Sequence, residues 1–230
     1  MDFFLGVTNK CNLNCSWCAH YRLRKLDPLY CISENEFNTW SKYTHSAGYY
    51  FKTININGLG EPTCYPDIKF LQYILIRSHK FCNTLHLLTN GINVDILKLI
   101  LPFIDEITVS MWPNSKEHWN DIELFKSYHE AKIHLRYNIE CHDIKEPYST
   151  SKSNKITKCG CYGPGYTMNT VFLACGTWAP TINKNGLYHT DLKEYYLDSL
   201  SSKLGTTSFR MCESCWANTE IPYKIIKYNE

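Results

Sequence analysis

Residues 3–18 read FFLGVTNKCNLNCSWC, an apolar segment joined directly to three cysteines. The apolar part, residues 3–8, has the length and composition of a buried β-strand. Cys11, Cys15 and Cys18 follow in a CxxxCxxC spacing, which chance would produce only about 0.03 times in a chain with this cysteine content. The sequence therefore predicts a thiolate-rich loop at the carboxyl end of a strand, where α/β folds place their active sites.

Segments of strand length and segments of helical period alternate along the first two thirds of the chain. The expected strands are residues 3–8, 52–57, 84–89, 106–111 and 133–139. The expected helices are residues 33–47, 66–80, 94–103 and 116–132. Ser33 and Glu36 predict a capping box at the first helix, and Pro66 with Asp67 predicts the start of the second. The alternation predicts an α/β fold with a parallel sheet.

The composition limits the kind of protein. A chain of 230 residues is long enough for one substantial core with a small appended module. Lys and Arg total 24 against 22 Asp and Glu, so the net charge of +2 gives no strong attraction to nucleic acid or to a membrane. We find no secretion signal and no apolar run of the roughly 18 residues that a membrane span needs. We therefore expect a cytoplasmic protein, whose 12 cysteines are better explained by metal ligation than by disulfides.

The number of cysteines in the first loop fits an open metal site. A 4Fe-4S cluster held by three thiolates leaves one iron without a protein ligand, and that iron can bind a cofactor. A structural zinc site prefers four protein ligands. Zinc with a distant fourth ligand, or thiols that simply pack in the core, are the alternatives. The spacing favours an iron–sulfur cluster on Cys11, Cys15 and Cys18.

This spacing, with an aromatic residue directly before the third cysteine, resembles the hallmark of the radical S-adenosylmethionine (SAM) superfamily. The resemblance implies a partial (β/α) barrel and SAM chelated to the open iron. It also implies the activity: a reductant such as flavodoxin or ferredoxin reduces the cluster, SAM is cleaved to a 5′-deoxyadenosyl radical, and the radical takes hydrogen from a substrate carbon. Trp17 stands in the aromatic position, which implies packing near the SAM adenine. The alternative is that Trp17 simply covers the loop.

Further residues resemble the SAM site of that superfamily. Residues 57–63 read NGLGEPT, similar to its GGEP element, which implies that Gly60 and Glu61 meet the SAM amino group. An ordinary turn is the alternative. Thr89 closes the third expected strand in a form common in the superfamily, and Ser110 resembles the hydroxyl that meets the SAM ribose. Arg136 is a candidate partner for the SAM carboxylate or an acidic substrate, with an ordinary surface position as the alternative.

Polar residues crowd positions 149–158, where the apolar period stops. This stretch predicts a linker between two domains, the barrel core at 1–147 and a small cysteine-rich α+β unit at 148–230. Within the second unit we expect a hairpin around Asn169 and Thr170, and a helix over 191–203.

Cysteines gather at ligand spacing again in the second unit. They are Cys159, Cys161, Cys175, Cys212 and Cys215. Four thiolates, two of them from a terminal CxxC pair, can hold one metal. The layout resembles the twitch domain, the shortened SPASM domain, which implies an auxiliary 4Fe-4S cluster. Whether Cys159 or Cys161 is a ligand stays open, and a zinc knuckle is the alternative. Cys31, Cys64, Cys82 and Cys141 stand apart in the sequence, and we expect them in the core.

In size and layout the chain most resembles the deoxy-scyllo-inosamine dehydrogenase type of radical SAM enzyme, which implies an oxidoreductase. A small metabolite such as an amino sugar or nucleoside is the favoured substrate, because the first expected strand starts close to Met1 and leaves no room in front for a peptide-recognition domain. A peptide maturase and an enzyme that modifies a nucleic-acid base are alternatives. From another class, a non-catalytic scaffold with zinc in both clusters is also kept.

Overall fold

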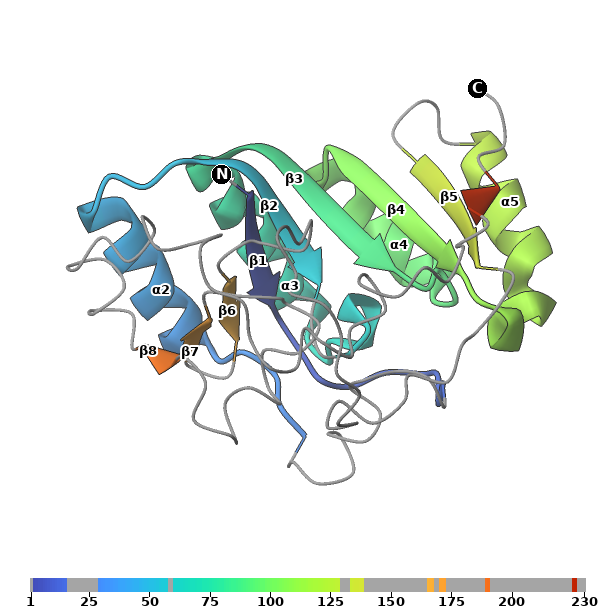
Figure 1. Ribbon diagram of the computed structural model, residues 1–230, viewed down its shortest axis with the longest axis horizontal. Helices are drawn as coiled ribbons and strands as arrows, with labels where there is room; N and C mark the ends of the chain where they lie inside the picture. Colours follow the sequence, from blue (N-terminus) through green and yellow to red (C-terminus); the bar gives the residue numbers. More distant parts are fainter. Residues whose placement is uncertain are drawn as a thin grey trace, which may run out of the picture.

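The computed structural model describes residues 2–15, 29–57, 60–128, 133–138, 165–167, 170–172, 189–190 and 225–226. Its centre is a nine-stranded sheet in the order β8-β7-β6-β1-β2-β3-β4-β5-β9. Helices lie along one face of this sheet, with α2 beside β1 and α5 beside β5 at the other end (Figure 1). The predicted α/β fold with a parallel sheet is therefore confirmed, whereas closure of the sheet into a partial barrel stays a prediction.

Five parallel strands carry the fold. They are β1 (Asp2–Gly6), β2 (Phe51–Asn57), β3 (Cys82–Thr89), β4 (Glu106–Met111) and β5 (Ile133–Asn138). Each strand pairs in parallel with the next one along the chain. Consecutive parallel strands need a crossover connection, which helices supply here. As a result, the carboxyl ends of β1 to β4 meet at one edge of the sheet. The five predicted strands are confirmed with ends shifted by two residues at most.

Short strands from the last third of the chain extend the sheet at both edges. β6 (Gly165–Thr167) runs parallel to β1, and β7 (Thr170–Phe172) pairs antiparallel with β6. The predicted hairpin around Asn169 and Thr170 is thus confirmed. β8 (His189–Thr190) follows β7, and β9 (Ile225–Ile226) pairs with β5. The predicted domain boundary at 147 and the predicted helix over 191–203 lie outside the described residues and stay predictions.

The helices begin where their capping residues are. α2 (Glu34–Ser46) starts after Ser33, whose hydroxyl accepts from the backbone N–H of Glu36 while the Glu36 carboxylate accepts from the N–H of Ser33. This is the predicted capping box. α3 (Ile68–Ser78) starts after Asp67, whose carboxylate accepts from the N–H of Phe70.

Two helices are shorter than the hydrophobic period indicated. α4 is Val94–Ile100 and gives way to a 3-10 turn, Leu101–Phe103, at Pro102, which has no N–H to continue the α-helix. α5 is Trp119–Tyr128 and follows a 3-10 segment, Pro113–His118, with non-helical backbone angles at Ser115. A third 3-10 turn, His79–Phe81, ends the α3 region. The predicted helix 94–103 was therefore too long as regular α-helix, and the predicted start at 116 was too early. Residues 129–132, at the predicted end of the second helix, lie outside the described residues.

The two faces of the sheet differ in polarity. Strand residues on the helix side are fully buried and apolar, and they include Leu5, Ile54, Ile56, Leu85, Leu87, Ile107 and Val109. An aromatic cluster closes this core at the β1 edge, where Phe3 stacks on both Trp40 and Phe51. Large buried rings of this kind each contribute about 3–5 kcal/mol to stability. The core thus explains which face the helices cover.

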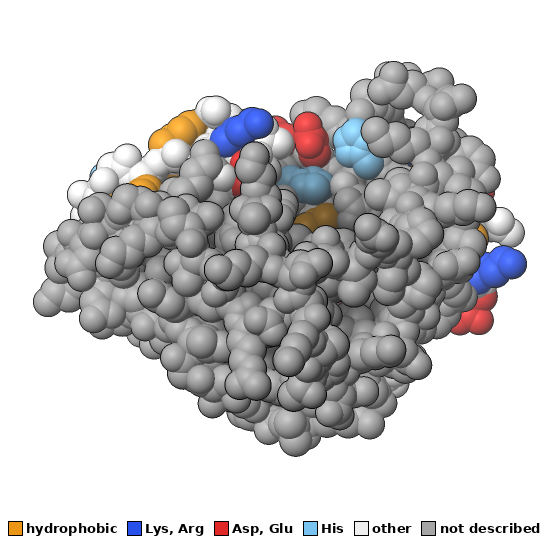
Figure 2. Space-filling model, in the orientation of Figure 1, with side chains coloured by type: hydrophobic (Ala, Val, Ile, Leu, Met, Phe, Trp, Pro, Cys, Tyr) orange, Lys and Arg blue, Asp and Glu red, His pale blue; other side chains and the backbone are white. Residues whose placement is uncertain are grey.

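The opposite face carries hydrogen-bonding side chains. His86 of β3 contacts the Asn55 side-chain oxygen through Nδ1 at 2.8 Å and the Thr108 hydroxyl through Nε2 at 2.8 Å. An amide oxygen only accepts, so Nδ1 carries the proton and Nε2 accepts from Thr108. On this side of the molecule, described side chains are visible along the upper margin, where they include histidine, acidic and Lys or Arg side chains, and at the right-hand edge, where further charged side chains are visible (Figure 2). In the described part of the chain, none of the helices has the length and apolar character to cross a membrane.

The α2 capping box gives a test of local stability. We expect Ser33→Ala to lower the free energy of unfolding by about 1 kcal/mol, because the N–H of Glu36 loses its acceptor. Ser33→Thr is the matched control, since it keeps the hydroxyl and should cost only a fraction of that amount. Denaturant unfolding monitored by circular dichroism measures both. Equal losses for the two variants would show that the hydroxyl does not cap this helix.

Candidate active site

Three loops meet at the carboxyl edge of the sheet. The loop after β1 contains Cys11 and Cys15, the segment after β2 contains Gly60 and Glu61, and the end of β3 contains Thr89. The sequence predicted these as site residues, and the structure brings the three loops into hydrogen-bond contact. Trp17 and Cys18 lie outside the described residues.

Glu61 is the centre of these contacts and is 3% exposed. Its Oε1 accepts from the backbone N–H of Thr63 at 3.1 Å and from the Thr63 hydroxyl at 2.8 Å. The Thr89 hydroxyl donates to the same oxygen at 2.6 Å. Oε2 accepts from the N–H of Asn90 at 2.7 Å. Two loops therefore direct four donors at one carboxylate, an arrangement that suits its charged form.

Burial nevertheless raises the pKa of Glu61 above its ordinary value, and the hydrogen bonds from Thr89, Asn90 and Thr63 lower it by less. The folded chain holds this proton more tightly than the unfolded chain does. The carboxyl thus contributes stability at low pH that is lost as the pH rises through its folded pKa. None of the shift's causes is a positive side chain of the described residues. A cationic group bound beside Glu61 would offset the burial and favour the carboxylate.

Gly60 is fixed by the cysteine loop. A Cβ at this position would overlap the carbonyl oxygen of Lys10 and lie 2.5 Å from the carbonyl carbon of Asn9. The next residue, Glu61, donates its backbone N–H to that same Lys10 oxygen at 2.6 Å. The close approach that glycine permits is therefore to the chain's own loop. The contact holds the backbone of Glu61 against Lys10, the residue that directly precedes Cys11.

The cysteine loop is closed at its neck by Tyr30. The Thr8 hydroxyl donates to the Tyr30 carbonyl at 2.8 Å, and the Asn9 side-chain oxygen accepts from the Tyr30 N–H at 2.7 Å. Beyond this neck, Cys11 Sγ accepts from the N–H of Leu13 at 3.4 Å. Cys11 is half-buried, Cys15 is buried, and neither is in a disulfide. Two of the three predicted ligands thus lie in a loop whose base is fixed.

Three asparagines that the sequence reasoning did not select connect the loops. Asn90 donates from Nδ2 to Asn12 Oδ1 at 2.8 Å, and Asn12 Nδ2 lies 3.4 Å from Asn93 Oδ1. Asn93 donates in turn to the carbonyl and hydroxyl oxygens of Thr63, at 3.1 and 3.2 Å. The available signal was the position of Asn90 and Asn93 just after a strand, but asparagine there is also an ordinary turn residue.

The remaining predicted contacts lie on β3, β4 and β5. Thr89 is buried, and its hydroxyl accepts from the N–H of Gly91 at 3.1 Å while donating to Glu61. Ser110 is half-buried on β4 and is the register partner of Arg136 on β5. Of the predicted SAM contacts, the structure therefore joins Gly60, Glu61 and Thr89 directly. From Thr89 on β3, Ser110 lies on the next strand of the sheet and Arg136 on the strand after that.

The cysteines expected in the core behave differently from one another. Cys82 is buried, and burial raises the pKa of its thiol to about 11. Cys31 is half-buried, with its sulfur 3.2 Å from the Thr8 hydroxyl. Cys64 is also half-buried. Burial first, and then the charges of Glu61 and Cys11, raise the pKa of its thiol to about 11. Cys64 stands apart from the first cysteine cluster in the sequence, but the turn after Glu61 brings it close to the cysteine loop in the folded chain. The prediction that it belongs with the core thiols was therefore wrong.

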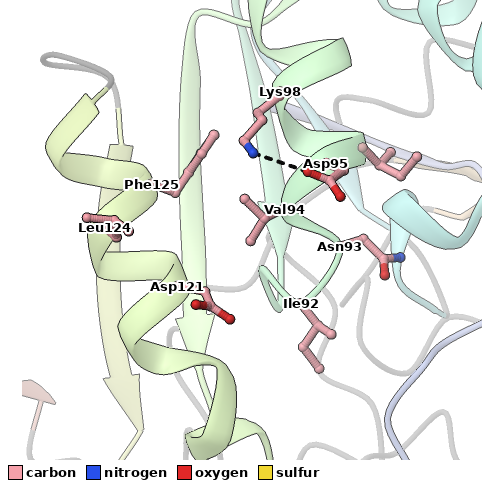
Figure 3. A pocket seen from close by; sticks show the side chains of 9 residues that line it. Ile92, Asn93, Val94, Asp95, Lys98, Asp121, Leu124 and Phe125 are labelled. Atoms are coloured by element: carbon pink, nitrogen blue, oxygen red, sulfur yellow. Dashed lines mark hydrogen bonds and ion pairs between the residues drawn. The ribbon is translucent and has the colours of Figure 1, made fainter.

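The described residues also form an open groove between α4 and α5, which lies in the helical layer (Figure 3). Val94 and Asp95 line it from α4, and Leu124 and Phe125 line it from α5. Lys98 forms an ion pair with Asp95 at 3.1 Å beside it. The groove contains none of the cysteines. Asn93 links the two regions, because it lines the groove and donates to Thr63.

Cys141, Cys159, Cys161, Cys175, Cys212 and Cys215 lie outside the described residues. The predicted auxiliary cluster therefore stays a prediction.

The described chain is an α/β protein with a parallel sheet and a polar, thiol-containing site at the carboxyl edge of that sheet. One solved structure that shares this fold is that of BtrN in complex with AdoMet and 2-DOIA. It matches with a TM-score of 0.65 and 13% sequence identity, over 92% of this chain and 83% of that chain. HydG, a maturase of the FeFe-hydrogenase, matches with a TM-score of 0.37 and 17% identity, over 48% of this chain and 25% of that chain. No known protein family matches the sequence, and no curated protein matches it.

The contact between Gly60 and Lys10 gives a test of the site's packing. We expect Gly60→Ala to lower the free energy of unfolding by about 3 kcal/mol, because the added methyl group meets backbone that must move. Gly48→Ala is the control: Gly48 has a φ of 66° and open space around it, so its loss should be about 1 kcal/mol from backbone strain alone. Denaturant unfolding measures both. A Gly60→Ala loss no larger than the control's would contradict this close packing.

Proposed function

We propose that this chain is a radical SAM enzyme. The observation that carries the proposal is the CxxxCxxC loop at the carboxyl end of β1, held by hydrogen bonds against a buried carboxylate at the end of β2. The fold shared with BtrN, whose structure contains AdoMet, supports the same activity. The partial barrel closure and the twitch-like second unit are part of this proposal.

Cys11, Cys15 and Cys18 would hold a 4Fe-4S cluster. When bound, the cluster supplies an electron that cleaves SAM to a 5′-deoxyadenosyl radical. The chain's own contribution is placement. The Tyr30 contacts close the neck of the loop, and the Lys10 carbonyl ties it to Glu61. Neither Cys11 nor Cys15 is in a disulfide, which fits a ligand role.

Glu61 would bind the SAM amino group. Its buried carboxylate has four donors and no positive partner among the described side chains, so an ammonium group would supply the missing charge. The four donors fix the orientation of the carboxylate before SAM binds. In this proposal Thr89 supports Glu61, Gly60 allows the loop contact, Ser110 meets the ribose, Trp17 packs on the adenine, and Arg136 neutralises a carboxylate.

A small polar metabolite is the proposed substrate class, with an oxidation as the net reaction. The face of the sheet opposite the helices carries Asn55, His86, Thr108 and Ser110, hydrogen-bonding side chains suited to hydroxyl and amino substituents. BtrN was solved with 2-DOIA, which supports a small substrate. An auxiliary cluster on Cys175, Cys212, Cys215 and one of Cys159 and Cys161 would take the second electron, and flavodoxin or ferredoxin would supply the first.

Anaerobic reconstitution tests the cluster. We expect about eight irons per chain in the wild type and about four after Cys11, Cys15 and Cys18 are all changed to Ala, because the auxiliary cluster remains. Dithionite with SAM should yield 5′-deoxyadenosine from the wild type and none from the triple variant. Cys82→Ala is the matched control and should behave as wild type, since Cys82 is a buried thiol at the opposite end of β3.

Two other results would contradict parts of the proposal. Zinc without iron in the wild type would contradict the proposal and support the non-catalytic scaffold. No iron in the triple variant would contradict the auxiliary cluster while leaving the first cluster in place.

The role of Glu61 is tested by SAM affinity. We expect Glu61→Gln to weaken SAM binding by roughly ten- to a hundredfold, the effect of losing one charge-assisted hydrogen bond to an ammonium group. Equilibrium dialysis with the reconstituted protein measures it. Glu106→Gln, an exposed carboxylate at the amino end of β4, is the control and should leave the affinity unchanged. Unchanged affinity in Glu61→Gln would mean that Glu61 only supports the loops.

A further inference from the structure

Asn90 uses its backbone N–H and both polar atoms of its side chain at the junction of the three loops. It is 6% exposed and follows directly after β3. Its backbone N–H donates to Glu61 Oε2 at 2.7 Å, its Nδ2 donates to Asn12 Oδ1 at 2.8 Å, and its Oδ1 accepts from the N–H of Ile92 at 3.1 Å. The same Nδ2 lies 4.0 Å from Cys11 Sγ. One residue thus contacts both the carboxylate and the cysteine loop.

These contacts close into a ring. Starting from the Asn90 amide, the bonds run to Asn12, Asn93, the Thr63 hydroxyl and Glu61 Oε1. The Asn90 backbone N–H completes the ring at Glu61 Oε2. From the Asn90 amide to Thr63 each member donates to the next, and Glu61 accepts from both Thr63 and the Asn90 N–H. The ring ties together segments that follow β1, β2 and β3.

We propose that Asn90 is a positioning residue that sets the spacing between the Cys11 thiolate and the Glu61 carboxylate, and that its amide donates toward the Cys11 sulfur once a cluster is bound. This rests on the proposed function, in which Cys11 binds the cluster and Glu61 binds SAM. In that proposal SAM would bind to an iron of the cluster. The distance between Cys11 and Glu61 would therefore decide whether SAM can reach that iron.

The chemistry of an amide suits this position. Hydrogen bonds to the sulfurs of a cluster set its reduction potential, and a donor stabilises the electron-rich reduced state. A lysine here would pair with the Glu61 carboxylate and compete with a cationic ligand, whereas an amide donates to the sulfur side and leaves the charge of Glu61 unpaired. The asparagine amides of the ring carry no charge. They can therefore hold Cys11 and Glu61 in place without neutralising either one.

Asn90→Ser isolates the side-chain amide. A serine at this position can still accept from the N–H two residues on, so the turn at Ile92 is kept, but its hydroxyl is too short to reach Asn12 or Cys11. Asn12→Ser removes the same bond from the other partner. The double variant should lose less than the sum of the two single variants, because the bond between Asn90 and Asn12 is counted in both. Asn83→Ser is the matched control, since Asn83 is exposed at the far end of β3.

Hydrogen exchange of the peptide spanning residues 9–15 is the first measurement, made before and after reconstitution. We expect exchange about three- to tenfold faster in Asn90→Ser and Asn12→Ser than in the wild type or Asn83→Ser. The second measurement is the midpoint potential of the first cluster, which should fall in Asn90→Ser and not in Asn83→Ser. Exchange at the wild-type rate would overturn the proposal. Faster exchange with an unchanged potential would also overturn it, because Asn90 would then only brace the fold.

A wild type that takes up no iron would contradict the proposed function instead. In that case the exchange rates of the metal-free variants still decide whether Asn90 positions the cysteine loop.

Discussion

The structure of the site depends on one buried carboxylate. Glu61 is removed from water, and an ionised carboxylate is costly to bury unless donors replace the water that it loses. The chain supplies four such donors from Thr63, Thr89 and Asn90. Because those donors come from the ends of two different strands, satisfying Glu61 fixes how the segments after β2 and β3 lie against each other.

The cysteine loop is then placed by backbone contact. The N–H of Glu61 donates to the Lys10 carbonyl, and this contact requires that Gly60 have no side chain. Gly91 permits a different close approach, on the β3 side of Glu61: its φ is 78°, and a Cβ there would lie 2.5 Å from Val109 Cγ1. Gly60 and the Glu61 backbone therefore fix where the cysteine loop lies relative to β2.

Much of the fold was predictable from local sequence, because its signals act over short distances. The capping box of Ser33 and Glu36 spans only four residues, and the β4 strand from Glu106 to Met111 was predicted with the correct bounds. Hydrophobic periodicity was a less reliable guide to helix ends where a proline or non-helical backbone angles interrupt the α-helix. Pro102 ends α4 although the apolar pattern continues, and the backbone at Ser115 separates a 3-10 segment from α5.

The part of the site that sequence reasoning missed is the part built from long-range pairs. Asn90 and Asn12 are 78 positions apart, and each is an unremarkable turn residue when considered alone. Cys64 was separated from Cys11 by the same kind of reasoning, yet the turn that carries Glu61 and Thr63 brings its thiol under the influence of the Cys11 charge. A sequence motif can identify residues that touch a cofactor, because the cofactor fixes the spacing of those residues along the chain. Residues that hold those motifs together follow the topology of the sheet instead, so they become visible only when neighbouring strand ends are known.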